Sequence, residues 1–427
     1  MIQITPHTVQ GAVAAPPSKS FSIRALMANY LSGSASTLHN LSDCEDVLTA
    51  QKLLTHLPLL PSYGLTVFPS YGLTVLRSYC LPCRESALTL HIAASVAALQ
   101  AQRFSFTARG SLQHRPLDSL VHALEAFGAR CSPAAARFPF WVEGPLRPAR
   151  QILDGRSGSQ AVSGLLMALP LLEGDSEITL LHPVSLPYID LTLEVMRRFG
   201  VFIDVMPVVQ GDGYRYLIKG KQSYRATELT VAGDWSGAAA VMAAAAVSGG
   251  KVRITGLGGG GPAVPDSIII KVLRCAGVVC TQIESDWEIS APNGLTPFSF
   301  DLTHAPDLAP VLTALAANTS GVSVLQGADR LKTKESSRGE VLQQIFGQLG
   351  IKIELSQGVM TIYGGRVAGC DHPVESHHDH RIAMAVAVAA AGARQPVSLS
   401  GASCVAKTYP RFWDDLASLG LPIQKIE

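Results

Sequence analysis

The chain has 427 residues, a length at which one hydrophobic core usually divides, so we expect two domains. Hydrophobic residues make up 47% of the chain and charged residues 16%, which excludes a largely disordered protein. The formal net charge is +1, and no run of Lys or Arg stands out. This balance argues against nucleic acid or a membrane surface as a partner, so any bound anion should be small.

The N-terminus reads Met-Ile-Gln-Ile-Thr-Pro and lacks the basic start and long apolar core of a signal peptide. The longest apolar stretches, residues 238–247 and 382–391, are Ala-rich and too short to span a bilayer. We interpret them as buried helices and expect a cytoplasmic protein. The eight cysteines show no zinc-ribbon spacing, and we expect them to be reduced thiols.

Short β-like runs alternate with Ala- and Leu-rich helical runs, which predicts an α/β fold. Strands are predicted at residues 103–108, 177–181, 215–219, 251–255, 322–326, 351–354 and 397–400. Helices are predicted at residues 22–32, 117–127, 159–171, 191–199, 236–248, 267–276, 308–317, 336–349, 381–391 and 410–419. We interpret residues 80–91 as a loop.

Several predicted helices are followed by a Gly and then an apolar strand. The glycines are Gly128, Gly200, Gly277 and Gly350. A Gly in this place suits the left-handed position after a helix C-terminus. Its return roughly every 70 residues suggests one α/β unit used several times.

Two further patterns indicate connections rather than sites. A heptapeptide at residues 61–67 is repeated at 69–75, and we interpret this as a local duplication in a surface hairpin. The Gly-rich stretch 256–262 lacks the Gly-Lys-Ser/Thr ending of a phosphate-binding loop and the spacing of a dinucleotide-binding loop.

Cations gather at the predicted helix starts, where free N–H groups and the helix dipole favour an anion. Lys19, Ser20 and Arg24 open the first predicted helix, with Ser20 and Arg24 on one face. Ser159 and Gln160 open another. These groups suit a phosphate or sugar hydroxyls, although an ordinary capped helix with solvated charges would show the same residues.

Three more groups lie in the C-terminal half: Lys334, Glu335 and Arg338; the run His377-His-Asp-His-Arg381; and Lys407. The histidines could indicate zinc, but no zinc-site spacing supports that interpretation. Arg115 and Asp307 each lie beside a proline at a predicted helix start. Together these residues describe several cations and two isolated carboxylates, which suits a reaction between two phosphorylated anions.

Seven motifs resemble those of the 5-enolpyruvylshikimate-3-phosphate synthase family in order and spacing. They are Pro17-Ser-Lys-Ser-x-Ser-x-Arg24, Gln113-His-Arg-Pro116, Gly158-Ser-Gln160, Ser185-Leu-Pro-Tyr-Ile-Asp190, Lys334-Glu-x-x-Arg338, Asp379-His-Arg381 and Ala406-Lys-Thr408. The resemblance implies a two-domain inside-out α/β barrel, each domain made of three repeats of a small α/β unit, with the active site in the interdomain cleft. It places residues 1–15 and 233–427 in domain one and 16–232 in domain two.

The resemblance also implies the reaction: transfer of the enolpyruvyl group of phosphoenolpyruvate to the 5-hydroxyl of shikimate-3-phosphate, by addition and then elimination of phosphate through a tetrahedral ketal. By motif, shikimate-3-phosphate binds Lys19, Ser20, Arg24, Ser159, Gln160, Ser185, Tyr188, Asp307 and Lys334. Phosphoenolpyruvate binds Lys19, Arg115, Gln160, Lys334, Arg338, Arg381 and Lys407. Asp307 and Glu335 move protons, and Lys19 and His380 support catalysis. No cofactor or metal is called for, and a monomer is expected.

One segment departs from the family. Where the family carries Gly-Asn-Ala/Ser-Gly-Thr-x-x-Arg, this chain reads Cys83-Arg-Glu-Ser-Ala-Leu-Thr-Leu90. Ser86 replaces the second Gly and Leu90 the final Arg in this comparison. Because Ser86 adds bulk, we expect weaker phosphoenolpyruvate binding and reduced sensitivity to glyphosate. Arg330 stands where Asn is usual.

Two alternatives stay open at this point. The sister enzyme that transfers enolpyruvyl to UDP-N-acetylglucosamine shares the fold, but its first motif has Lys-Asn where this chain has Lys19-Ser20. A binding protein descended from the enzyme would explain the altered segment, yet it would have little reason to keep both Asp307 and Glu335.

Overall fold

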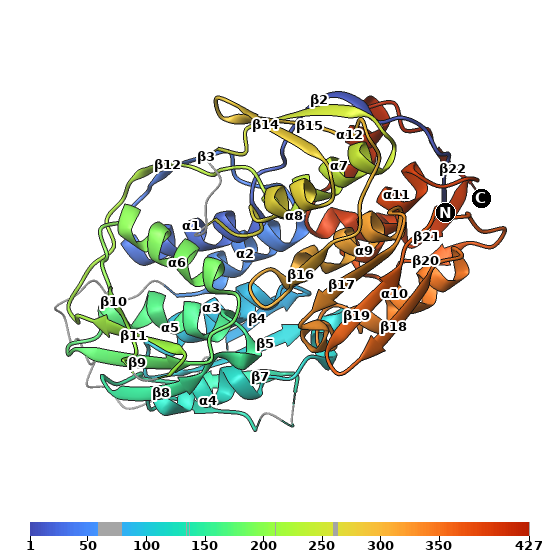
Figure 1. The fold of residues 1–427 in the computed structure, drawn as a ribbon. Coiled ribbons are helices and arrows are strands. Elements are labelled where there is room, and N and C mark those ends of the chain that lie inside the picture. The colour runs from blue at the N-terminus through green and yellow to red at the C-terminus, as the bar shows by residue number, and fades with distance from the viewer. Residues whose placement is uncertain (59–78, 134, 136, 210, 259–263, 427) are drawn as a thin grey trace. The chain divides into compact units, whose positions relative to one another are not determined.

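The computed structural model describes residues 1–58, 79–133, 135, 137–209, 211–258 and 264–426 (Figure 1). The chain divides into two units: Met1–Ser18, Ser42–Glu45 and Ala232–Glu427 form unit 1, and Lys19–Leu41 and Asp46–Val231 form unit 2. The chain thus enters unit 2 three residues later, and leaves it one residue earlier, than the sequence-based boundaries. Residues 42–45 join unit 1, although the sequence placed them in the second domain.

The described strands of unit 1 form three four-stranded sheets. These are β20-β21-β1-β22 (Val374–Glu375, Val397–Ser400, Ile2–Ile4, Ile423–Lys425), β14-β15-β13-β2 (Val279–Ile283, Asp286–Ser290, Lys251–Thr255, Gln10–Ala14) and β16-β17-β19-β18 (Ser299–Asp301, Val322–Gln326, Val359–Tyr363, Lys352–Ser356). In the first sheet β1 comes from the N-terminus and pairs with the C-terminal β22 (Figure 1). Unit 1 therefore holds both ends of the chain.

The described strands of unit 2 form two four-stranded sheets and one strand pair. They are β4-β5-β7-β6 (Tyr79–Arg84, Arg103–Ala108, Phe140–Glu143, Arg130–Cys131), β10-β11-β9-β8 (Asp204–Pro207, Gly213–Ile218, Ser176–Leu181, Arg150–Asp154) and β12-β3 (Glu228–Thr230, Thr37–His39). Every four-stranded sheet contains one parallel pair followed by two antiparallel pairs. One small α/β unit is thus repeated along the chain, as the sequence predicted.

Each repeat carries a buried helix and a second helix. The first kind comprises α1 (Lys19–Ser32), α3 (Ala87–Ala97), α5 (Gln160–Ala168), α7 (Trp235–Val247), α9 (Ala309–Ala317) and α11 (His380–Ala391). The second comprises α2 (Glu45–His56), α4 (Asp118–Ala126), α6 (Leu186–Arg198), α8 (Ile269–Cys275), α10 (Arg338–Gln348) and α12 (Phe412–Ser418). None of the described helices combines the length and apolar character needed to cross a membrane.

The centre of unit 1 is a triplet of helices, α7, α9 and α11, which pack against one another. Their Ala-rich sequences let the helices approach closely, and nearly every side chain in them is buried. The sheets cover this triplet and present their alternate residues to it. In unit 2, α1 and α5 both pack against α3. Helices therefore lie inside and sheets outside in each unit.

The four glycines singled out in the sequence all have left-handed backbones, with φ between +82° and +88°. At Gly350 the N–H donates to the Gly347 carbonyl and the next N–H, of Ile351, donates to Phe346. This is the Schellman arrangement, which satisfies carbonyls at the helix end and turns the chain into the next strand. Gly420 ends α12 in the same way.

Several sequence-based boundaries were wrong for identifiable reasons. The predicted loop 80–91 contains strand β4 and the start of helix α3. Almost every side chain of α3 is buried, so the helix has no polar face from which to read a period. Helix α6 begins at Leu186, five residues before the prediction, because Pro187 is tolerated in a first turn. Helix α2 was not predicted. The duplicated heptapeptide and residues 259–262 of the Gly-rich stretch lie outside the described residues.

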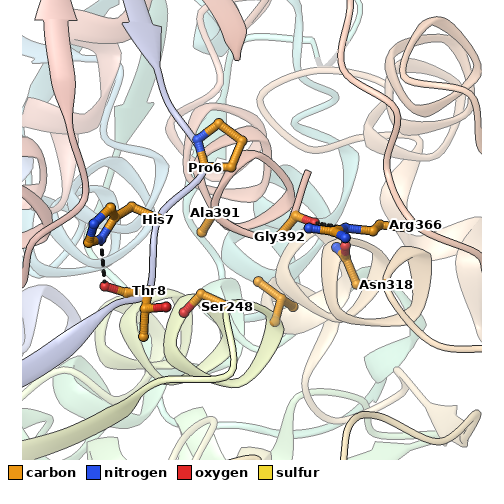
Figure 2. Close-up of a pocket in the computed structure, with 9 residues that line it drawn as sticks. Pro6, His7, Thr8, Ser248, Asn318, Arg366, Ala391 and Gly392 are labelled. Atoms are coloured by element: carbon orange, nitrogen blue, oxygen red, sulfur yellow. Dashed lines mark hydrogen bonds between the residues drawn. The ribbon is translucent and has the colours of Figure 1, made fainter. Parts of the chain in front are cut away.

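A cavity of about 320 Å³ lies at the C-terminal end of the unit 1 triplet. Figure 2 shows Ser248 after α7, Asn318 after α9 and Gly392 after α11 around it, with Arg366 donating to the Gly392 carbonyl. The predicted cations lie at the opposite ends of these helices. The cavity is therefore separate from the candidate site.

Candidate functional site

Asp307 lies at the centre of a cluster of charges in unit 1. Its Oδ1 is 3.1 Å from Lys334 Nζ and 2.9 Å from Arg338 Nη1. Its Oδ2 is 3.5 Å from Arg381 Nη2. The carboxylate is thus held by three cations that the sequence placed in two separate motifs.

Helix starts bring these cations together. Asp307 precedes α9, Arg338 is the first residue of α10, and Arg381 lies in the first turn of α11. Arg381 Nη1 also donates to the hydroxyl of Ser236, in the first turn of α7, at 2.5 Å. The N-termini of the three central helices therefore meet at one place. Lys334 lies before α10, and its side chain meets that of Arg338 at Asp307.

Arg338 is fully buried and contacts three carboxylates. Besides Asp307, its Nη2 donates to Glu335, and its Nε donates to Asp379 Oδ2 at 2.8 Å. Lys407 Nζ lies 3.9 Å from Glu335 Oε1. His380 is buried with its Nδ1 at 3.9 Å from Asp379 Oδ1. The cluster thus contains four cations and three carboxylates.

The balance of burial and charge decides the ionisation of this cluster. Burial alone would raise the pKa of Asp307, but Lys334, Arg381 and Arg338 outweigh it and hold that pKa well below its usual range. Burial lowers the pKa of Lys334, with Asp307 opposing. Burial would also lower the pKa of Arg338, yet Asp379, Glu335 and Asp307 raise it above its ordinary value. Asp307 is therefore a carboxylate at neutral pH.

In unit 2 the first predicted group forms at the start of α1. Lys19 is the first residue of the helix, and its Nζ is 3.1 Å from Asp46 Oδ2. Arg24 is buried one turn later, where its Nη1 donates to the Ser20 carbonyl at 3.0 Å. The predicted shared face of Ser20 and Arg24 is thus present.

Neutral oxygens surround the Arg24 guanidinium. Its Nε donates to Thr192 Oγ1 at 2.7 Å, and its Nη2 donates to Ser163 Oγ and to the Tyr188 carbonyl at 3.3 and 3.0 Å. Burial lowers the pKa of Arg24 to about 10, with Tyr188 opposing. A buried cation with this surrounding would be stabilised by an anion.

Three further predicted residues lie at the helix starts near Arg24. Ser159 precedes α5 and is buried, and Gln160 is the first residue of that helix. Ser185 precedes α6 with φ +56° and ψ +38°, a left-handed backbone that is costly for Ser. Thr192 of α6 and Ser163 of α5 both contact Arg24, so these two helices and α1 meet at the guanidinium.

The remaining predicted cation of unit 2, Arg115, lies beside His91 of α3. Burial and the Arg115 charge lower the pKa of His91 to about 4, although its hydrogen bond to the Ala87 carbonyl opposes this. Leu90 is fully buried in the core. The Ser86 hydroxyl lies 2.8 Å from Thr89 Oγ1, in the first turn of the same helix. An imidazole therefore lies close enough to Arg115 to feel its charge, which the sequence comparison missed.

The sequence also missed the partners of the predicted cations. Asp379, Ser236, Asp46, Ser163 and Thr192 all contact a predicted site residue. Asp379 stood in a motif without a role of its own, although an Asp directly before an Ala-rich helix indicates an N-cap. The others carry no local signal.

No three His, Cys, Asp or Glu side chains in the described part of the chain are placed to hold a metal ion. All eight cysteines fall within it, and each is a free thiol. The chemistry available to these residues is anion binding by buried cations and proton transfer by carboxylates.

Comparisons with known proteins agree with this picture. The profile of the EPSP synthase (3-phosphoshikimate 1-carboxyvinyltransferase) family matches residues 4–416. A 3-phosphoshikimate 1-carboxyvinyltransferase of Aeropyrum pernix is 35% identical over 426 residues, covering 100% of this chain and 97% of its own. One of Clostridium kluyveri is 32% identical over 425 residues, covering 98% and 97%. The solved EPSP synthase of Acinetobacter baumannii has a TM-score of 0.74 at 24% identity and covers 99% of both chains.

The repeated α/β units, with helices inside and sheets outside, define the two-domain inside-out α/β class, here with cations gathered at helix starts. Within that class the chain belongs to the EPSP synthase family of enolpyruvyl transferases.

Proposed function

We propose that this protein transfers the enolpyruvyl group of phosphoenolpyruvate to the 5-hydroxyl of shikimate-3-phosphate and releases phosphate. Family membership and the full-length similarity to two 3-phosphoshikimate 1-carboxyvinyltransferases support the proposal. The observation that carries it is the Asp307 cluster, in which two carboxylates suited to proton transfer lie among four cations.

Shikimate-3-phosphate has a phosphate, a carboxylate and ring hydroxyls. We assign its binding to Lys19, Ser20, Arg24, Ser159, Gln160, Ser185 and Tyr188 of unit 2, and to Asp307 and Lys334 of unit 1. The buried Arg24 supports this assignment, because a dianionic phosphate would stabilise a guanidinium surrounded by neutral oxygens. Phosphoenolpyruvate is assigned to Lys19, Arg115, Gln160, Lys334, Arg338, Arg381 and Lys407.

In the proposed addition step, Glu335 delivers a proton to the methylene carbon, and Asp307 accepts the proton of the attacking hydroxyl. The electron pair of that hydroxyl forms the new C–O bond of a tetrahedral ketal. Elimination then returns a proton from the methyl group to the protein, and phosphate leaves with the C–O bond electrons. Lys407 and Arg381 stabilise the departing negative charge.

The ionisation of Asp307 suits this role once ligands are bound. Lys334 and Arg381 hold its pKa low. Anionic substrates that contact these two cations would reduce their stabilisation of the carboxylate. Its proton affinity would then rise, which makes it a better base at the moment of attack.

The test is phosphate release from phosphoenolpyruvate, with shikimate-3-phosphate in one reaction and UDP-N-acetylglucosamine in another. We expect release only with shikimate-3-phosphate. Asp307→Asn should lower kcat by a factor of about 10² to 10⁴. The exposed Asp175, which pairs with Lys219, gives a control, because Asp175→Asn removes a surface carboxylate that has no assigned role. Release with UDP-N-acetylglucosamine alone, or with neither acceptor, would contradict the proposal.

Reduced glyphosate sensitivity stays a prediction. The Ser86 hydroxyl contacts Thr89, and the imidazole of His91, whose pKa is lowered to about 4, lies within electrostatic reach of Arg115. Both features favour weaker binding of an anion near Ser86 and Arg115. We expect an inhibition constant above the range of sensitive family members, and a lower constant in Ser86→Gly. A wild-type constant within the sensitive range would contradict the prediction.

We further propose that the protein acts as a monomer in the cytoplasm without nucleic acid or membrane partners. The net charge of +1 supports the absence of polyanionic partners. Sedimentation equilibrium at several protein concentrations tests the monomer, which a concentration-dependent mass would contradict.

A further inference from the structure

Asp379 connects the starts of two helices from neighbouring repeats. Its Oδ2 accepts hydrogen bonds from Arg338 Nε and Ser336 Oγ at 2.8 and 3.0 Å. Its Oδ1 accepts from Arg338 Nη2 at 3.2 Å and from the backbone N–H of Arg381 at 3.0 Å. One carboxylate thus receives four donors from residues that precede or begin α10 and α11.

Both members of the Asp379–Arg338 pair are fully buried, each with 0% exposure. The contact is bidentate and uses Nε–H and one Nη2–H of the guanidinium, so it fixes the plane of the guanidinium as well as its place. The other edge of Arg338 donates to Asp307 and Glu335, the two carboxylates assigned to proton transfer. Arg338 therefore has an anchored edge and an edge turned to the chemistry.

We propose that Asp379 is a positioning residue, which acts through Arg338. It holds the guanidinium so that the edge that contacts Asp307 and Glu335 stays aligned with these two carboxylates and with phosphoenolpyruvate. The inference rests on the proposed function, and it adds a residue to which neither the family motifs nor the mechanism above gave a role. The Ser336 hydroxyl and the Arg381 N–H complete the hydrogen bonds of the carboxylate, so Asp379 is held in turn from both helices.

A purely structural role would look different in solution. Asp379 is also the N-cap of α11, and loss of a cap costs stability without selecting one substrate. A residue that acts through Arg338 should instead alter the binding of phosphoenolpyruvate more than that of shikimate-3-phosphate. It should also have little further effect once Arg338 itself has been changed.

The experiment compares Asp379→Asn, Arg338→Lys and the double variant in the phosphate-release assay, with the melting temperature of each. We expect Asp379→Asn to raise KM for phosphoenolpyruvate at least tenfold and KM for shikimate-3-phosphate less than threefold. The double variant should match Arg338→Lys within about twofold. Asp415→Asn is the matched control, because Asp415 of α12 is a buried carboxylate bound to Tyr409 and Arg411, which precede that helix. It should lower the melting temperature without a difference between the two substrates.

The KM values and the double variant distinguish the positioning role from a purely structural one. Equal increases in both KM values, or losses that multiply in the double variant, would overturn the inference. If Asp379→Asn does not fold, Ser336→Ala removes one donor to the same carboxylate and should give a smaller effect of the same selectivity. An inactive wild-type protein would overturn the proposed function alone. The inference would then be tested by thermal protection with phosphoenolpyruvate, which Asp379→Asn should weaken and Asp415→Asn should not.

Discussion

Arg24 and Arg338 are both buried guanidiniums, but their surroundings differ in charge. Arg338 contacts three carboxylates, which raise its pKa above the ordinary value against the effect of burial. Arg24 contacts hydroxyl and carbonyl oxygens, and among the described residues it has no carboxylate within ion-pair distance. Burying a charge without a counter-ion is costly, so the buried Arg24 guanidinium indicates a ligand that supplies the missing negative charge.

We therefore expect Arg24→Lys to weaken shikimate-3-phosphate binding by about 10- to 100-fold, because Lys cannot make the fork of hydrogen bonds to Thr192, Ser163 and a phosphate. Calorimetric titration of the purified variant measures this. Arg215→Lys is the control, since Arg215 of β11 is a surface residue that pairs with Glu177 of β9. An affinity within twofold of the wild type in Arg24→Lys would contradict the assignment.

His91 gives a prediction about pH. Its ordinary pKa of 6.5 is lowered to about 4 in the folded chain, first by burial and then by Arg115. Between these values the unfolded chain binds a proton that the folded chain does not, so stability falls as the pH falls from about 6.5 to about 4. The loss from this group is on the order of 3 kcal/mol.

Urea unfolding at pH 7 and at pH 4.5 should show a smaller loss in His91→Gln than in the wild type. His56→Gln is the control, because His56 is exposed at the end of α2. If the wild type and His91→Gln lost stability equally over this range, His91 would not be a neutral, partly buried imidazole.

At the scale of elements, the sequence predicted several strands and the Ala-rich central helices of unit 1, but it did not predict helix α3. Strands β13, β17 and β21 have the predicted bounds, because one face of each packs on a core and the sequence alternates accordingly. Helix α3 is buried on nearly all sides, so its sequence has no alternation of apolar and polar residues to reveal it. Apolar and polar residues alternate in a helix only where one of its faces contacts water, and α3 has almost no such face.

Gly347 and Gly350, one helical turn apart at the end of α10, give a prediction about the free energy of unfolding. Gly350 follows α10 with φ +82°, and a Cβ there would lie 3.3 Å from Ala368 Cβ. Gly347 lies inside α10 and has open space around its Cα. We expect Gly350→Ala to cost about 1–2 kcal/mol and Gly347→Ala to add about 0.5–1 kcal/mol.

Chemical unfolding of both variants measures these changes in the free energy of unfolding. The two substitutions add the same methyl group three residues apart, so each serves as the control for the other. Equal effects of one sign would show that the left-handed end of α10 does not contribute as described.

The candidate site divides in the same way between what the sequence predicts and what needs the fold. Lys19, Arg24, Arg338 and Arg381 were found because cations at helix starts form a local pattern. Their partner carboxylates, Asp46 and Asp379, lie 27 and 41 residues away from Lys19 and Arg338. Such pairings depend on which repeats adjoin, which no short window of sequence contains.

At the scale of the whole molecule, the proposed reaction draws on both units. Shikimate-3-phosphate is assigned to Arg24 and its neighbours in unit 2 and to Asp307 and Lys334 in unit 1. A ligand that binds only the folded state stabilises it by an amount set by its concentration relative to Kd. If both assignments hold, one ligand should protect backbone amides in both units.

Hydrogen exchange followed by mass spectrometry tests this. Shikimate-3-phosphate at about 100 times its Kd, without phosphoenolpyruvate, should slow exchange in peptides that cover the starts of α1 and α6 and in those that cover residues 306–308. It should stabilise the folded protein by about 2.7 kcal/mol. At the same concentration Arg24→Lys should lose protection in both units together, because a single ligand causes it. Protection confined to unit 2 would remove Asp307 and Lys334 from the shikimate-3-phosphate site and leave them to phosphoenolpyruvate alone.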